Sequence, residues 1–226
     1  MYNYRVASIP LLATAIGACS IGLSLLLSIH YETHDWARRL WYVSQFAGKF
    51  PNNIPFIMGM HFVAVCIYVI IEMLCFKLRK QCGARGISYI LKLFSCASAV
   101  SLALLSVVST YESSKMHNNI VAFFFACAGC TSLYVLIASC KLKKQNKSSF
   151  SLTCTLQLLC FLGIAASLAT LGIVWFIVDR NVYRDYGIQA EYSSIFFLFI
   201  MLALTALDLK DDVIIYAPGE DTLLSM

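Results

Sequence analysis

Charged residues are scarce in this chain. Of its 226 residues, 13% are charged and 60% are apolar, and the mean hydropathy is +0.76. A soluble domain averages about 25% charged residues, so this chain has too few polar side chains to cover a water-exposed surface. The composition excludes an ordinary soluble domain and predicts an integral membrane protein.

Several signatures of enzymes and transporters are also absent. The sequence contains no Gly-rich phosphate loop, no Gly-x-Ser-x-Gly elbow and no His-Glu-x-x-His motif. No run of charged groups within the apolar segments marks an ion pathway, which disfavours a channel or transporter. The basic residues cluster between apolar runs, a pattern of membrane topology and not of nucleic-acid binding. A non-enzymatic role is favoured over an enzymatic one, and no nucleic-acid partner is expected.

The apolar residues are grouped into six runs. A membrane-spanning helix needs about 20 mostly apolar residues, and each run approaches or exceeds that length. The prediction is an all-α polytopic membrane protein, a single domain over 1–226 with a short acidic tail at 208–226. The six expected spans are residues 6–29, 54–76, 86–110, 120–140, 151–178 and 190–207.

Two short basic segments determine the expected orientation. The segments Lys77–Arg85 and Lys141–Lys147 each carry four Lys or Arg residues close to the ends of spans. Cytosolic loops of membrane proteins carry an excess of Lys and Arg. Both termini and both basic segments are therefore predicted to be cytosolic, and the first, third and fifth loops to face the opposite side.

The ten cysteines do not resemble a disulfide framework. Eight lie inside the expected spans, and none lies in a loop assigned to the non-cytosolic side, where thiols are oxidised. The Cys127-Ala128-Gly129-Cys130 segment has the spacing of redox and zinc motifs, but it lies in an apolar span without a second pair nearby. Core packing is the favoured interpretation, and no metal or cofactor is expected.

A few polar residues lie near the expected membrane surfaces. On the non-cytosolic side, His117 begins the fourth span with Asn118 after it, Glu191 begins the sixth, and His61 lies two turns into the second. A histidine with a carboxylate can perform acid–base chemistry or bind a metal, whereas the alternative is that these groups are simply solvated. No catalytic residue is identified among them.

One further pair lies near the cytosolic side. Glu72 and Lys92 are each about one turn from the cytosolic ends of the second and third spans. They are expected to form a structural ion pair, with snorkelling to the interface or a proton relay as alternatives.

Short motifs are distributed along nearly the whole chain. The first loop contains Tyr42-Val43-Ser44-Gln45 followed by Pro51, and Thr110–Ser114 precedes His117-Asn118-Asn119 in the centre. Glu191-Tyr192 opens the last span after Asn181-Val182-Tyr183. Together these segments resemble the FRAG/DRAM/SFK superfamily of six-span membrane proteins, which carries the CWH-type N-terminal domain.

Within that superfamily, the chain is more similar to the post-GPI-attachment remodelling factors of the Golgi and ER. The Thr-Tyr-x-Ser-Ser form and Asp208 followed by Ile214, Ile215 and Pro218 carry this likeness, and the Phe-Gln typical of the DRAM autophagy-modulator branch is missing. The resemblance implies lipid remodelling of GPI-anchored proteins, with membrane lipids and those proteins or other membrane proteins as partners. The alternative is a DRAM-like regulator of autophagy or membrane trafficking in the lysosomal or plasma membrane. Under the first interpretation, His117, Asn118 and Glu191 would form a polar site at the luminal lipid interface.

Overall fold

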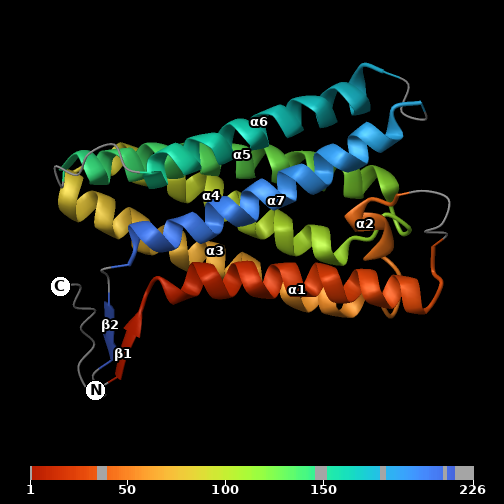
Figure 1. The fold of residues 1–226 in the computed structure, drawn as a ribbon, viewed down its shortest axis with the longest axis horizontal. Coiled ribbons are helices and arrows are strands. Elements are labelled where there is room, and N and C mark those ends of the chain that lie inside the picture. Colours follow the sequence, from red (N-terminus) through yellow and green to blue (C-terminus); the bar gives the residue numbers. More distant parts are fainter. Residues whose placement is uncertain (1, 35–39, 146–151, 179–181, 211–212, 217–226) are drawn as a thin grey trace.

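Six long helices form the body of the protein (Figure 1). The computed structural model describes residues 2–34, 40–145, 152–178, 182–210 and 213–216. Within them, six helices are long and apolar enough to cross a membrane, which confirms the polytopic all-helical fold. These helices are α1 (Ser8–His30), α3 (Asn53–Cys82), α4 (Arg85–Val107), α5 (Ser114–Gln145), α6 (Leu152–Phe176) and α7 (Arg184–Asp208).

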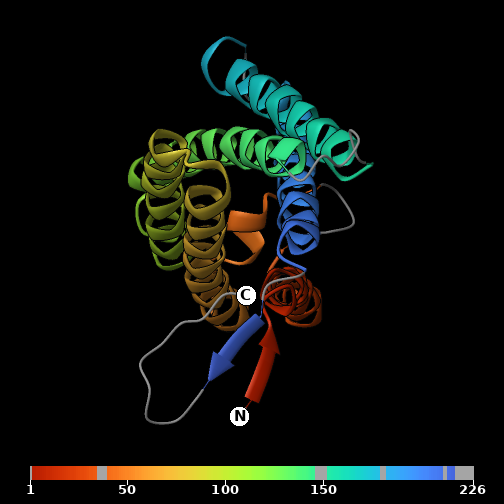
Figure 2. The same cartoon turned by 90° about the vertical axis from the view of Figure 1, so that its left-hand side faces the viewer.

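The long helices surround a common interior. Along the chain, α1 packs against α3, α3 against α4, and α4 against α5, and α7 then contacts both α5 and α1. α6 lies outermost against α7 and α5 (Figure 2). A four-residue helix, α2 (Val43–Phe46), lies within one end of the bundle. We refer to this end as the α2 end and to the opposite one as the basic end.

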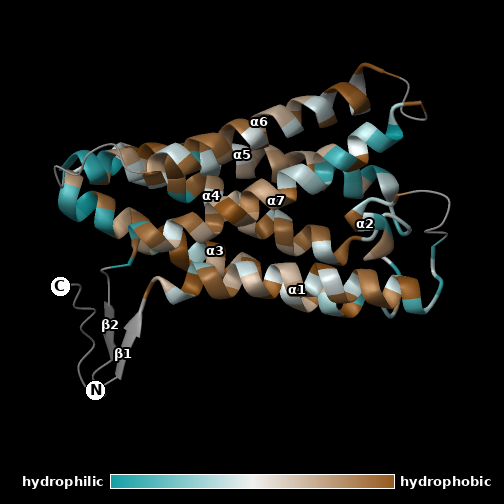
Figure 3. Ribbon diagram, in the orientation of Figure 1, coloured by the Kyte–Doolittle hydropathy of each residue, from teal (hydrophilic) through white to brown (hydrophobic). Residues whose placement is uncertain are grey.

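In α1, small residues face the interior and large apolar residues face outward. The buried positions include Ala13, Gly17 and Ser20, whereas Leu23 and Leu26 are exposed. Leucine gains nothing by leaving lipid, so helix association in membranes depends on close packing, which small side chains permit. Figure 3 shows apolar residues over the middle of the bundle and polar residues towards its two ends.

Gly17 illustrates how closely α1 approaches its neighbours. A Cβ atom at this position would lie 2.7 Å from the Phe199 ring of α7 and 3.1 Å from Val63 of α3. At Gly17, α1 therefore packs closely against both α7 and α3. At Gly22 an added Cβ would meet nothing within 4 Å.

The basic segments continue the helices that precede them. α3 extends through Cys82 and ends at Gly83, whose φ of 62° is the left-handed conformation that glycine adopts readily. Lys and Arg are good helix formers, and their charge is favourable at a helix C-terminus. The connection between α3 and α4 is therefore only Gly83 and Ala84.

The described parts of both termini lie at the basic end (Figure 1). There β1 (Tyr2–Arg5) pairs antiparallel with β2 (Val213–Tyr216), a small addition to the helical fold. Residues 211–212 and 217–226 of the expected tail, residues 146–147 of the second basic segment, and Asn181 and Pro218 of the motifs lie outside the described residues. The described parts of the termini and of both basic segments share one end of the bundle, and its cytosolic exposure remains a prediction.

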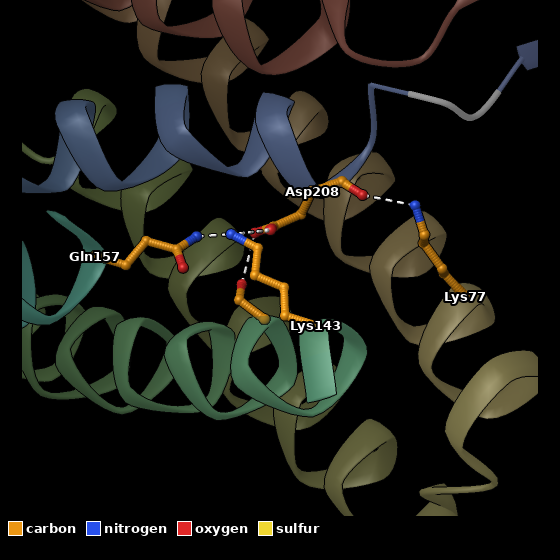
Figure 4. A network of polar contacts seen from close by, with 5 residues as sticks. Lys77, Lys143, Gln157 and Asp208 are labelled. Carbon is orange, nitrogen blue, oxygen red and sulfur yellow. Dashed lines mark hydrogen bonds and ion pairs between the residues drawn. The ribbon is translucent and has the colours of Figure 1, made fainter. Parts of the chain in front are cut away.

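Asp208, the last residue of α7, is the centre of a buried polar network at the basic end (Figure 4). Its Oδ2 accepts hydrogen bonds from Ser139 Oγ at 2.6 Å and from Gln157 Nε2 at 2.8 Å. Lys143 Nζ lies 3.7 Å from Oδ1, and Lys77 Nζ donates to the backbone carbonyl of Asp208 at 2.6 Å. Through Asp208 alone, the network joins α3, α5 and α6 to the C-terminal end of α7.

The predicted orientation can be tested by glycosylation mapping. Glycosylation sequons inserted into the first loop should be modified in cells, because that loop is expected to face the lumen. Sequons inserted after Gly83, or into the α5–α6 connection, should remain unmodified. The readout is an endoglycosidase-sensitive mass shift. Modification at either of the last two sites would overturn the orientation.

The Asp208 network should contribute strongly to stability. Asp208→Ala removes the acceptor of Ser139 and Gln157, and removing one partner of a buried ion pair costs about 3–5 kcal/mol. The Lys143 side chain is 19% exposed, so we expect the lower value, or a melting temperature about 6–12 °C lower for a chain of this size. Thermal unfolding in detergent, followed by tryptophan fluorescence, measures it.

Asp185→Ala is the matched control. Asp185 is an exposed aspartate in the first turn of the same helix, and exposed substitutions usually change stability by about 0.5 kcal/mol or less. Equal melting temperatures for the two variants would show that the network adds no stability.

Candidate functional site

The α2 end contains every residue of the expected luminal site. α3, α5 and α7 all begin there, so His61, His117 and Glu191 lie near the beginnings of three different helices. The structure nevertheless divides these residues between separate environments.

Glu191 binds the beginning of α2. Its side chain is buried, and Oε2 accepts a hydrogen bond of 3.1 Å from the backbone N–H of Val43. The first N–H groups of a helix have no partner within that helix. A carboxylate in α7 thus supplies the missing acceptor for a helix in the first loop.

Other residues near the beginning of α7 hold the same segment. Arg184 Nη2 donates to Gln45 Oε1 at 3.3 Å, and its guanidinium group lies 5.4 Å from the centre of the Trp41 ring. Tyr192 Oη donates to the Trp41 carbonyl at 3.1 Å. A Cβ at Gly187 would come within 2.6 Å of Tyr42 Oη, so a larger residue there would force the Tyr42 side chain to shift.

His117 occupies the first turn of α5. The ring is 2% exposed, and Nδ1 lies 2.6 Å from the Val108 carbonyl. A carbonyl only accepts hydrogen bonds, so Nδ1 carries a proton. Nε2 is buried and has no hydrogen-bond partner among the described residues.

His117 and Glu191 line two different cavities. Glu191 lines a cavity of about 140 Å³ in the core of the bundle, and His117 lines a second cavity of about 50 Å³. Ser44 of α2 and Phe56 of α3 line both cavities. α2 therefore contributes to both cavities, whereas Glu191 and His117, which were expected in one site, each line only one of them.

The remaining expected site residues lie apart from both cavities. His61 is exposed on α3, with Nδ1 2.8 Å from the Ile57 carbonyl and 3.1 Å from Ser106 Oγ of α4. Asn118 is half-buried and lines neither cavity. Towards the basic end, Lys92 Nζ lies 2.5 Å from Glu72 Oε1, so these two side chains form an ion pair between α3 and α4.

A third polar cluster is one that the sequence did not indicate. His34 Nε2 lies 2.8 Å from Tyr111 Oη, and Tyr111 Oη donates to the Gln45 carbonyl at 3.3 Å. Partial burial raises the pKa of Tyr111, which keeps its hydroxyl protonated as a donor. Asn52, fully buried, donates to Thr33 Oγ1 and to the Phe46 carbonyl. The Asn52 bonds thus stabilise the first loop internally, and the Tyr111 bonds hold that loop against the α4–α5 connection.

The α2 end combines a buried acidic residue with two cavities of different polarity. In the part of the chain that the structure describes, no three His, Cys, Asp or Glu side chains come together as metal ligands. The Glu191 carboxylate is bonded to α2, and most of the residues that line the cavity with it are apolar. The accessible features are an apolar core cavity and a smaller polar cavity beside it.

The contact between Glu191 and Val43 should stabilise the α2 end. Glu191→Ala leaves a buried N–H without its acceptor, which costs about 1–3 kcal/mol, or about 2–12 °C in melting temperature at this chain length. Glu191→Gln retains an acceptor oxygen and should lose much less. Thermal unfolding of the purified variants in detergent distinguishes them. An alanine variant as stable as wild type would show that the hydrogen bond contributes nothing.

The comparisons with known proteins agree with this architecture. The family model described as the Frag1/DRAM/Sfk1/Cwh43P N-terminal domain matches residues 2–212. No curated protein and no solved structure matches the chain. The matched residues include the seven helices α1 to α7 and every residue of the Asp208 network. This multi-pass membrane protein therefore belongs to the Frag1/DRAM/Sfk1/Cwh43P N-terminal domain family.

Proposed function

We propose that this protein holds a lipid acyl chain in the core of its bundle and acts in the lipid remodelling of GPI-anchored proteins in the Golgi or ER membrane. The observation that carries the proposal is the core cavity. Its volume of about 140 Å³ is close to that of an engineered apolar cavity of about 150 Å³ that binds benzene. The cavity is thus large enough for an apolar guest.

The shape of the cavity fits a linear guest. Its lining follows α7 from Glu191 to Thr205, which are 14 residues apart and therefore about 21 Å apart along a helix. Residues of α1, α3, α4 and α5 complete the wall, most of them Ile, Leu, Val, Phe or Met. A volume this small spread over that length accommodates a single extended chain.

The chemistry of the lining supports an uncharged alkyl chain. Glu191, at the α2 end, is the ionisable residue of the lining, and its carboxyl group is hydrogen-bonded to the backbone N–H of Val43. A chain that enters from the bilayer leaves an equally apolar solvent, so it gains packing contacts and little hydrophobic energy. Selection among lipids must therefore come from polar groups at the α2 end.

This role does not require the protein to be an enzyme. Glu191 and His117 line different cavities, and the proposal assigns no joint chemical step to them. We assign the protein the role of a binding factor that presents or shields an acyl chain. Membrane lipids are the direct partners, and GPI-anchored proteins are the proposed clients.

The proposal predicts that filling the cavity abolishes lipid binding and function. Ala128→Phe places a ring in the cavity wall, whereas Ala126→Phe adds the same ring on the exposed side of α5. Native mass spectrometry of the wild-type protein should show about one co-purified lipid, and this signal should be lost in Ala128→Phe alone. The acyl chains of surface GPI anchors, measured in cells lacking the protein, should be restored by wild type and Ala126→Phe but not by Ala128→Phe.

Two results would overturn parts of this proposal. Unchanged anchor lipids in cells lacking the protein would exclude GPI remodelling, and co-purified lipid that persists in Ala128→Phe would exclude the cavity. Localisation of a tagged protein to lysosomes would instead favour the DRAM-like role in autophagy or membrane trafficking.

A further inference from the structure

The second cavity differs from the core cavity in its chemistry. It lies between α2, the beginning of α3, the end of α4 and the connection that leads to α5. Its volume is about 50 Å³, whereas one water needs only about 10–15 Å³ on a comparable measure. The cavity thus has room for a group of several atoms. Its polar lining consists of Ser44, Asn53, Ser106, Ser109, Glu112 and His117.

Two buried atoms around this cavity have unused hydrogen-bonding capacity. Nδ1 of His117 donates to the Val108 carbonyl, and burial disfavours the charged form of the ring. In the neutral ring, Nε2 is then an acceptor. Asn53 Oδ1 is likewise buried, and neither atom has a partner among the described residues. Leaving a buried acceptor unsatisfied costs about 1–3 kcal/mol. Each of these two acceptors could be satisfied by a guest that donates a hydrogen bond.

The charge of the cavity lining also favours a guest that donates hydrogen bonds. Glu112 is the charged residue of the lining, and its Oε2 is already bonded to the Ser109 N–H at 3.4 Å, which leaves acceptor capacity on the carboxylate. Lys49 of the first loop lies over the Tyr111 ring at 4.9 Å from its centre and does not line the cavity. A guest should therefore carry N–H donors and a positive charge.

We propose that the second cavity binds a primary ammonium group, such as the end of an ethanolamine headgroup. A primary ammonium is a compact cation with three N–H donors, which match His117 Nε2, Asn53 Oδ1 and the Glu112 carboxylate. A quaternary ammonium has the same charge but no N–H group, so it leaves both buried acceptors unsatisfied. This inference goes beyond the acyl-chain role and stands on the polar cavity alone.

Binding can be tested on the purified full-length protein in phosphatidylcholine nanodiscs. Ethanolamine should bind saturably in calorimetric titration and raise the melting temperature, with a dissociation constant of about 1 mM for so small a ligand. Choline, which lacks N–H donors, and ethylene glycol, which lacks charge, should have no effect at the same concentration. Nanodiscs containing phosphatidylethanolamine should block the ethanolamine response if the guest is a lipid headgroup, and should leave it intact if the guest is a free amine.

Three variants connect binding to this cavity. His117→Phe and Glu112→Gln should each weaken ethanolamine binding about tenfold or more, corresponding to one lost charged or buried hydrogen bond. Asn119→Ala, exposed in the same turn as His117, should bind as wild type does. If His117→Phe does not fold, Glu112→Gln and Asn53→Ala test the same cavity at an exposed and a half-buried residue. Both should bind ethanolamine more weakly than Asn119→Ala does.

Several outcomes would overturn the assignment. An equal response to choline would show that charge alone is recognised, and unchanged binding in Glu112→Gln and Asn53→Ala would place the amine elsewhere. No response of the wild type to ethanolamine in phosphatidylcholine nanodiscs would mean that the cavity holds water only. Ala128→Phe should retain ethanolamine binding, so failure of the acyl-chain proposal and failure of this one remain distinguishable.

Discussion

Two buried acidic residues on α7 stabilise the bundle, one at each of its ends. Glu191 binds the backbone of α2 at one end, and Asp208 binds side chains of α5 and α6 at the other. They are 17 residues apart, which is about 25 Å along a helix and most of the roughly 30 Å of a bilayer core. Within hydrocarbon a polar group must find its partner inside the protein. α7 satisfies this requirement at both of its ends.

The remaining interior depends on that arrangement. With α7 fixed by its ends against α1, α5 and α6, the centre is lined by side chains of five long helices and α2. α2 itself closes the α2 end, because it is held by Glu191, Arg184 and the Asn52 and Tyr111 hydrogen bonds. α2 thus forms part of the wall of both the apolar core cavity and the polar cavity.

Hydropathy predicts the six helices, but it cannot predict the contacts between their polar groups. The number of spans follows from composition and length alone, because each apolar run is long enough to cross a bilayer. α2 has only four residues and carries no periodic signal, and the Asp208 partners are separated by 51 and 69 positions. Nothing in a single sequence indicates which distant amide or hydroxyl a buried carboxylate will meet.

The candidate site is predictable from the sequence in part. Polar residues at span ends usually have packed partners, and the structure gives His117 and Glu191 such partners in Val108 and Val43. His117 and Glu191 line different cavities, which share Ser44 and Phe56 in their walls, and a common role for the two residues in one site stays a prediction. α2, which contributes Ser44 to both walls, comes from the first loop, which has no recognisable helical pattern.

Stability alone does not account for either cavity. At about 24 cal/mol per Å³, an empty core cavity of about 140 Å³ costs the fold about 3 kcal/mol. The two unsatisfied acceptors beside the polar cavity add a cost of about 1–3 kcal/mol each. Together these costs approach the net stability of many small domains, about 5–15 kcal/mol. One larger side chain in the core and one apolar residue in place of His117 would remove much of that cost. The proposed guests would offset the same cost by filling the core cavity and by donating hydrogen bonds to the two acceptors.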